Sequence, residues 1–152
     1  MTPGNCSILL VEDDANDVFF MERAMSKAGL QPPAHVAVNG QEAVDYLSGI
    51  GRYADRDAFP IPRCIFLDLK LPFLDGFQVL VWMRDQSQLK DISVFVLTSS
   101  PENSDRQRAW ELGAKAYLIK PPTAQMLLDV LKFVPECLPS SGTASVPTSS
   151  SR

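Results

Sequence analysis

The fold is decided by one stretch of the chain, Cys64-Ile65-Phe66-Leu67-Asp68-Leu69-Lys70-Leu71-Pro72-Phe73-Leu74-Asp75-Gly76. Its first four residues are apolar, which is typical of a strand covered on both faces of a parallel sheet. The apolar run stops at the carboxylate of Asp68, and a proline and an Asp-Gly pair then mark a loop and a turn. A strand that ends in this way presents Asp68 at the carboxyl edge of its sheet, which is where open α/β folds bind their ligands.

A second apolar run with the same design lies near the amino terminus. Residues 7–11 are followed directly by Glu12, Asp13 and Asp14. If the two strands lie side by side and parallel, these carboxylates crowd together with Asp68 at one edge of the sheet. Like charges at such distances repel one another unless a cation lies among them. Because the ligands are hard oxygens with no paired His or Cys nearby, the pattern indicates Mg²⁺ rather than zinc.

Length and composition restrict the class of protein. A chain of 152 residues corresponds to one domain, and 45% hydrophobic with 21% charged residues is ordinary for a soluble globular protein. The formal charge of -4 gives no basic surface, so nucleic acid is not expected as a direct partner. No apolar run approaches the ~20 residues of a membrane span, and the amino terminus does not have the pattern of a signal peptide. We therefore expect a cytoplasmic protein with no membrane partner.

The cysteines form an odd and scattered set, namely Cys6, Cys64 and Cys137. Cys6 and Cys64 fall in or beside predicted buried strands, which favours their interpretation as small core residues. Free thiols also suit a reducing cytoplasm. We expect no metal-binding or redox role for them.

Apolar runs alternate with helix signals along the whole chain. Strands are predicted at residues 6–11, 34–38, 64–68, 91–97 and 114–119, and helices at residues 14–28, 40–48, 76–86, 101–112 and 124–134. The helix starts carry capping residues: Asp14 or Asn16, Asn39 with Glu42, Asp75, Ser100 before Pro101, and Thr123.

Two segments lie outside this alternation. Residues 49–63 form a connection of about fifteen residues, longer than the usual αβ loop. Either it is a loop with a function such as partner contact, or the preceding helix extends into it. Residues 139–152 are rich in Ser, Thr and Pro and cannot bury a core. The sequence therefore predicts one domain over residues 1–138 and a disordered tail over residues 139–152.

Five strands that alternate with five helices predict an α/β fold with a doubly wound parallel sheet and three layers. The flavodoxin-like strand order 2-1-3-4-5 puts its topological switch point between the first and third strands. Those two strands end in the carboxylates described above, so the acidic cluster is predicted to be a site.

The later strands add a hydroxyl and an ammonium group to the same edge. Thr98 ends the fourth predicted strand, and Lys120 follows the fifth. Acids that hold Mg²⁺, a hydroxyl donor and a lysine around one point are suited to a phosphoryl group, whose charge of about -1.5 to -2 they can balance. Asp68, central among them, can act as the nucleophile and form an acyl phosphate.

At these residues the sequence resembles the receiver domain of two-component response regulators, over about residues 6–134. The resemblance rests on four motifs in order, Leu10-Val11-Glu12-Asp13-Asp14, Leu67-Asp68-Leu69-Lys70-Leu71-Pro72 with Asp75-Gly76, Val96-Leu97-Thr98-Ser99, and Gly113-Ala114-Lys115-Ala116-Tyr117-Leu118-Ile119-Lys120-Pro121.

The resemblance implies that a histidine kinase phosphorylates Asp68. It implies that Mg²⁺ is bound by Asp13, Asp68 and the main-chain carbonyl of Lys70, with Glu12 acting through water. Thr98 and Tyr117 would form the switch pair, and a cis peptide bond before Pro121 would aim Lys120. The protein would then be a signalling switch rather than an enzyme, with only self-phosphorylation and self-dephosphorylation chemistry.

The switch is expected to repack the surface formed by residues 101–134, where Trp110 is predicted to be exposed and Val130 to lie in the core. Met126 and Phe133 flank the same side. We expect a homodimer or partner interface there. Lys70 and Ser100 lie two residues after Asp68 and Thr98, positions that tune the lifetime of an acyl phosphate. Lys70 either pairs with the phosphoryl group or extends into solvent.

The segment 49–63 and the Leu-Pro-Phe-Leu-Asp-Gly loop are most similar to stand-alone receivers that serve phytochrome-type and hybrid histidine kinases. Two other classes use a related sheet. A haloacid dehalogenase-like phosphohydrolase would need a second Asp where Lys70 stands, and a flavin-binding electron carrier would need a phosphate-binding loop where Glu12, Asp13 and Asp14 stand.

Overall fold

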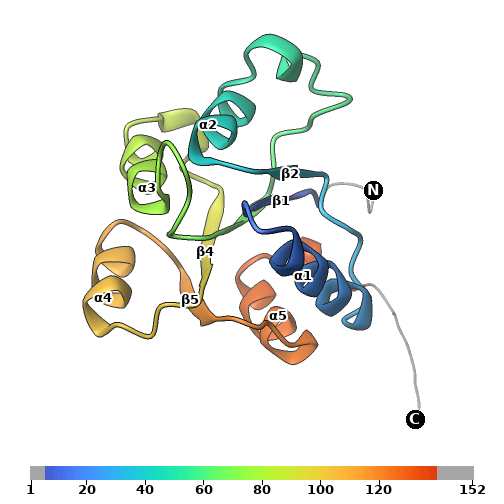
Figure 1. Ribbon diagram of the computed structural model, residues 1–152. Coiled ribbons are helices and arrows are strands. Elements are labelled where there is room, and N and C mark those ends of the chain that lie inside the picture. Colours follow the sequence, from blue (N-terminus) through green and yellow to red (C-terminus); the bar gives the residue numbers. More distant parts are fainter. Residues whose placement is uncertain (1–5, 140–152) are drawn as a thin grey trace.

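The computed structural model describes residues 6–139 and contains one parallel sheet of five strands, in the order β2-β1-β3-β4-β5 (Figure 1). The strands are β1 (Ile8–Val11), β2 (His35–Ala37), β3 (Cys64–Leu67), β4 (Ser93–Thr98) and β5 (Ala116–Ile119). The helices are α1 (Ala15–Lys27), α2 (Gly40–Ser48), α3 (Gly76–Arg84), α4 (Asn103–Glu111) and α5 (Ala124–Val130). The predicted fold class and strand order are confirmed.

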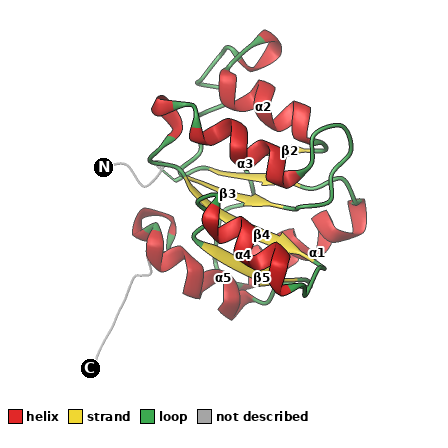
Figure 2. Ribbon diagram, turned by 90° about the vertical axis from the view of Figure 1, so that its left-hand side faces the viewer, coloured by secondary structure: helices red, strands yellow, loops and turns green. Residues whose placement is uncertain are grey.

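The sheet lies between two layers of helices (Figure 2). Because successive strand residues point to opposite faces, each strand contributes to two separate cores. Leu9 and Leu67 pack with residues of α2, α3 and α4, whereas Leu10 and Phe66 pack with residues of α1 and α5. Every residue of β1 and β3 is buried, which explains why both strands are wholly apolar in sequence.

Strand register sets the position of the charged residues. Val11 of β1 pairs with Leu67 of β3, so Glu12 and Asp68 emerge at the same level of the sheet. The backbone N–H of Asp68 continues the ladder by donating to the carbonyl of Val11 at 3.1 Å. Thr98 pairs with Ile119 in the same way, and Lys120 follows directly. The carboxyl edge thus brings together the side chains that the sequence singled out.

Most helix starts agree with the predicted caps. Asp14, Asn39, Asp75 and Thr123 each accept a hydrogen bond from a backbone N–H of the first turn. Glu42 does not complete the predicted box at Asn39, because its carboxylate accepts from the backbone N–H of Val38 instead. These caps satisfy N–H groups that have no partner within the helix.

Two helices differ from the prediction. The helix predicted from residue 101 begins at Asn103, after Glu102, which provides no side-chain cap. The hydroxyl of Ser100 accepts from the backbone N–H of Glu102 at 3.3 Å and donates to Asp105. The last helix ends at Val130 rather than near residue 134. Two short 3₁₀ turns, Leu131–Phe133 and Pro135–Cys137, follow it.

The connection over residues 49–63 is a packed loop rather than a helix extension. Gly49 has a φ of +69°, a left-handed conformation that ends α2 and favours glycine. Arg56 then donates to the carbonyls of Tyr46 and Leu47 at 2.8 and 3.0 Å, and so satisfies the end of the helix. Aromatic rings also pack between the loop and the helix, and the ring centroids of Tyr53 and Tyr46 are 5.1 Å apart.

The prediction for the cysteines is wrong in one respect. Cys6 and Cys137 form a disulfide bond, with their Cα atoms 5.0 Å apart across a sequence separation of 131 residues. The pair joins the segment before β1 to the last 3₁₀ turn, a proximity that no local pattern reveals. Cys64 is a buried free thiol, as expected, and burial raises its pKa to about 12.

Within residues 6–139, none of the helices is long and apolar enough to cross a membrane. The disordered tail predicted for residues 139–152 lies, apart from Pro139, outside the described residues.

Candidate functional site

Three acidic side chains meet at the carboxyl edge of the sheet, between β1 and β3. One carboxylate oxygen from each of Glu12, Asp13 and Asp68 lies within 4.8 Å of the others. Glu12 and Asp68 are buried, whereas Asp13 is exposed. Burial raises the pKa of Glu12 above its usual range, against the hydrogen bond from Lys120. Hard oxygen ligands so closely grouped, with two of them shielded from water, fit a divalent metal ion.

Lys120 balances this negative charge from the end of β5. Its Nζ lies 2.5 Å from Glu12 Oε1 and 2.9 Å from Asp68 Oδ2. Burial alone would lower the pKa of this ammonium, but the hydrogen bonds that it donates to nearby carboxylates outweigh burial and raise the pKa. The peptide bond between Lys120 and Pro121 is cis, as the resemblance implied. The structure therefore brings Glu12, Asp13, Asp68 and Lys120 together as predicted.

Thr98 and Tyr117 are linked through the loop after β4. Thr98 is fully buried, and its hydroxyl oxygen accepts from the backbone N–H of Ser100 at 3.4 Å. The Tyr117 hydroxyl donates to the Ser100 carbonyl at 2.9 Å, and the guanidinium of Arg106 lies 4.6 Å from the ring centroid. Burial raises the pKa of Tyr117. A movement of the Ser100 backbone would therefore change the hydrogen bonds of both side chains.

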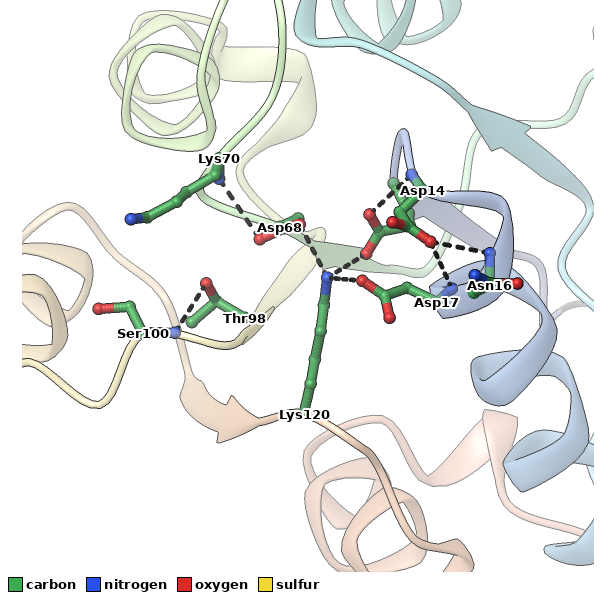
Figure 3. Close-up of polar contacts among 9 residues, drawn as sticks. Asp14, Asn16, Asp17, Asp68, Lys70, Thr98, Ser100 and Lys120 are labelled. Atoms are coloured by element: carbon green, nitrogen blue, oxygen red, sulfur yellow. Dashed lines mark hydrogen bonds and ion pairs between the residues drawn. The ribbon is translucent and has the colours of Figure 1, made fainter.

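The two positions predicted to tune an acyl phosphate do not face the acidic cluster. The Ser100 side chain is buried, and its hydroxyl donates to Asp105 Oδ2 at 2.7 Å. Lys70 donates its backbone N–H to Asp68 Oδ1 at 3.3 Å, but its exposed side chain extends away from Asp68 (Figure 3). The Lys70 side chain thus extends into solvent in the unphosphorylated site.

Asp17 was not predicted as a site residue. Its carboxylate lies 2.7 Å from Lys120 Nζ, opposite Asp68 (Figure 3). An acidic residue in the first turn of a helix is usually explained by the helix dipole alone. The position of Asp17, three residues after the cap Asp14, could have indicated that it belongs to the site, because the first turn of α1 starts at the same edge of the sheet.

Gly76 holds the start of α3 directly against the phosphoryl-acceptor candidate. A Cβ atom on Gly76 would lie 2.3 Å from the carbonyl oxygen of Asp68 and 2.7 Å from the Cα of Leu69. The backbone N–H of Gly76 also donates to the Leu69 carbonyl at 2.9 Å. Only glycine permits this close approach of helix and strand end.

We expect Gly76→Ala to lower the free energy of unfolding by roughly 1 to 3 kcal/mol, because the methyl group overpacks against backbone. The backbone must move to make room for the methyl group, and this movement should displace Asp68 and slow phosphoryl acceptance. Urea unfolding and phosphorylation rate measure the two effects. Gly51→Ala is the control, since a Cβ there meets nothing within 4 Å although φ is +60°. Gly51→Ala should lower the free energy of unfolding by about 1 kcal/mol through backbone strain alone. It should leave the phosphorylation rate unchanged. Equal phosphorylation rates for both variants would contradict the prediction.

Comparison with known proteins identifies the family. The family model of the response regulator receiver domain matches residues 8–132. The chain is 33% identical over 129 residues to the probable methanogenesis regulatory protein FilR2 of Methanothrix harundinacea, with 85% of this chain and 81% of that protein covered. It is 33% identical over 127 residues to the response regulator Rcp1 of Synechocystis sp., with 84% and 82% covered.

Solved structures give the same result. The bacteriophytochrome response regulator RtBRR superposes with a TM-score of 0.74 at 37% identity, with 85% of this chain and 77% of that chain covered. The Mn²⁺-bound form of Rcp1 superposes with a TM-score of 0.67 at 29% identity, with 93% and 99% covered.

The chain belongs to the response regulator receiver domain family. It is the receiver domain of a two-component response regulator, and that single domain covers most of the chain. Receiver domains are signalling proteins rather than classical enzymes, and as a family they accept phosphoryl groups from sensor histidine kinases. Its relatives include Rcp1 and bacteriophytochrome response regulators.

Proposed function

We propose that Asp68 accepts a phosphoryl group from a sensor histidine kinase and that the chain thereby acts as a phosphorylation-activated switch. One observation carries the proposal: the carboxylate of Asp68 lies 2.9 Å from the Lys120 ammonium and within 4.8 Å of the Glu12 and Asp13 oxygens. A nucleophilic carboxylate thus lies where both a cation site and a fixed ammonium can neutralise the negative charge of an incoming phosphate.

The transfer can be written with this chain's own residues. A carboxylate oxygen of Asp68 attacks the phosphorus of a phosphohistidine, a P–O bond forms, the P–N bond breaks, and the imidazole leaves and takes up a proton from water. Lys120 pairs with a phosphoryl oxygen as negative charge gathers there. The hydroxyl of Thr98 donates to a second oxygen. Positioning and charge neutralisation are the main contributions in such chemistry.

Mg²⁺ is the proposed cofactor. Asp13, Asp68 and the main-chain carbonyl of Lys70 would hold it, and Glu12 would act through water. The ion supplies neutralisation of phosphoryl charge when bound. The solved structure of the Mn²⁺-bound form of the relative Rcp1 supports this assignment.

Thr98 and Tyr117 are the proposed switch pair. When phosphate draws the Thr98 hydroxyl towards Asp68, the loop bearing Ser100 shifts, and the Tyr117 ring follows because its hydroxyl is bonded to the Ser100 carbonyl. Two discrete packings of the α4–β5–α5 surface would result. A hollow of about 420 Å³ lies on that surface, and Arg106, Trp110 and Tyr117 line it.

The α4–β5–α5 surface is also the proposed contact for a partner or for a second copy of the chain. Trp110 of α4 is 66% exposed, whereas Val130 of α5 is buried in the core as predicted. Phe133 is also exposed, but it lies in the 3₁₀ turn after α5 rather than on the helix. Tryptophan is enriched at the centres of interfaces, and the hollow beside Trp110 offers a surface on which a partner can pack.

Trp110→Ala should weaken self-association or partner binding at least tenfold, because a central aromatic side chain often contributes about 2 kcal/mol to an interface. Sedimentation of the BeF₃⁻-treated chain measures self-association, with Val81→Ala on α3, also exposed, as the control. A Trp110→Ala variant that dimerises as the wild type does would count against the surface.

The function is tested by incubating the chain with Mg²⁺ and acetyl phosphate. A single adduct that peptide mass spectrometry maps to Asp68 supports the receiver function. Repeated turnover of phosphate esters would instead favour a phosphohydrolase, and a yellow purified protein would favour a flavin carrier. Absence of an adduct in the presence of Mg²⁺ would contradict the proposal.

The finer points of partner and location follow from this function. Similarity to bacteriophytochrome response regulators supports a phytochrome-type or hybrid histidine kinase as the donor. Such kinases draw their phosphoryl groups from ATP, so we place the chain in the cytoplasm. We assign residues 1–138 to the receiver domain.

A further inference from the structure

Asp17 occupies a defined place beside the site. It lies in the first turn of α1, where Asp14 accepts hydrogen bonds from the backbone N–H groups of Asn16 and Asp17 at 2.8 and 3.1 Å. This cap fixes the turn, and the Asp17 carboxylate accepts a hydrogen bond from Lys120 Nζ at 2.7 Å (Figure 3). The contact joins residues 103 positions apart and is shorter than the bond from Lys120 to Asp68.

The donors of Lys120 are fully used in the unphosphorylated site. An ammonium group has three N–H donors. Three carboxylates face it, with Glu12 at 2.5 Å, Asp17 at 2.7 Å and Asp68 at 2.9 Å from Nζ. A phosphoryl group on Asp68 would bring further acceptor oxygens and a charge of about -1.5 to -2. Attack by Asp68 removes its own carboxylate charge, so one phosphoryl oxygen can take over the N–H that now binds Asp68. A second phosphoryl oxygen can bind the ammonium only if Glu12 or Asp17 releases it.

Asp17 is the carboxylate that can leave at the lowest cost. Its side chain is 35% exposed, compared with 3% for Glu12 and 8% for Asp68. A partly exposed carboxylate can turn into water and keep its hydration, whereas a buried one would be left without a partner. Asp17 is also outside the acidic cluster that fits a metal ion, so its release leaves that cluster unchanged.

We propose that Asp17 is a positioning residue that holds the Lys120 ammonium in the unphosphorylated state and competes with the phosphoryl group for it. The inference rests on the proposed role of Asp68 as phosphoryl acceptor. Asp17 competes with the phosphoryl oxygens for the donors of Lys120, so the Asp17 charge makes the phosphorylated state less favourable than it would be in a site without that charge. Asp17 thereby lowers the equilibrium fraction of the chain that is phosphorylated at a given supply of phosphoryl donor.

The test compares two variants of the full chain for binding of BeF₃⁻ in the presence of Mg²⁺. Asp17→Asn keeps the size of the side chain and removes its charge, and it should bind BeF₃⁻ roughly three- to fivefold more tightly than the wild type. Asp14→Asn is the matched control, since Asn caps a helix as well as Asp does. Among the described residues Asp14 has no ion pair with Lys120, and its change should alter the affinity by less than about twofold.

Two further measurements separate competition from other causes. In a Lys120→Gln background, the Asp17→Asn change should no longer tighten BeF₃⁻ binding, because no ammonium remains to compete for. Binding of Mg²⁺ alone should be unchanged or slightly weaker in Asp17→Asn, since a negative charge is lost. A merely structural role for Asp17 would weaken the binding of both ligands.

Three results would overturn the inference. They are equal BeF₃⁻ affinities for Asp17→Asn and the wild type, weaker binding by Asp17→Asn, and an equal gain in the Lys120→Gln background. Failure of the proposed function looks different, because the wild type would then bind no more BeF₃⁻ than Asp68→Asn does.

Discussion

Replacement of Asp68 by asparagine should reduce phosphoryl acceptance to background while the protein remains folded. The amide is not a nucleophile, so the step that forms the acyl phosphate is lost altogether. The fold should tolerate the change, because the asparagine oxygen can still accept from Lys120, which now donates to Asp68 at 2.9 Å. Loss of one of several crowded carboxylates also removes some repulsion from Glu12.

Phosphoryl acceptance is measured by intact mass after incubation with acetyl phosphate and Mg²⁺, and folding by circular dichroism. Asp75→Asn is the matched control, because it makes the same chemical change in the same loop and Asn also caps α3. This control should be phosphorylated like the wild type. Persistent modification of Asp68→Asn at the wild-type rate would show that another residue is the acceptor.

Reduction of the disulfide between Cys6 and Cys137 should strongly lower the free energy of unfolding. The bond closes a loop across 131 residues of sequence, nearly the whole domain, and so removes much of the freedom of the unfolded chain. In the chain-entropy account of cross-links, a loop of this size stabilises the folded state by roughly 3 to 5 kcal/mol. We expect a loss of that order in the free energy of unfolding when the bond is reduced.

Urea unfolding with and without a dithiol measures this loss, and a Cys6→Ser, Cys137→Ser variant should match the reduced protein under both conditions. Cys64→Ala is the control, since its buried free thiol should leave the difference between oxidised and reduced protein unchanged. Identical unfolding of the oxidised and reduced chains would contradict the prediction. Alkylation of thiols in cells quenched with acid would show which form is present there, since a reducing cytoplasm favours free thiols.

Sequence alone determined the sheet and the central part of the site. Strands buried on both faces must be continuously apolar, so β1 and β3 were visible as runs that end in charge. Right-handed crossovers then left few topologies, and they put Glu12 and Asp68 at the switch point. Thr98 and Lys120 could be assigned for the same reason, since Thr98 ends one strand of the same parallel sheet and Lys120 directly follows another.

Only the tertiary structure decided the contacts made by side chains far from one another in sequence. Asp17 contacts Lys120 because α1 begins at the carboxyl edge of the sheet and the long Lys120 side chain reaches across that edge from the end of β5 (Figure 3). The sequence neighbours of Asp17 indicate only that it lies in a first helical turn. Cys6 meets Cys137 because the last 3₁₀ turn returns to the start of β1. The Ser100 hydroxyl binds Asp105 as well as the backbone N–H of Glu102, and the helix begins only at Asn103.

The physical reason is a difference in range. Strand and helix patterns arise from burial that repeats every two or 3.6 residues, so a short window of sequence contains the whole signal. A hydrogen bond or a disulfide between distant residues depends on where complete elements pack, to within a fraction of an ångström, and no window of sequence contains that distance. The sequence of this protein therefore specified which residues line the edge of the sheet, and packing specified which of them bind one another.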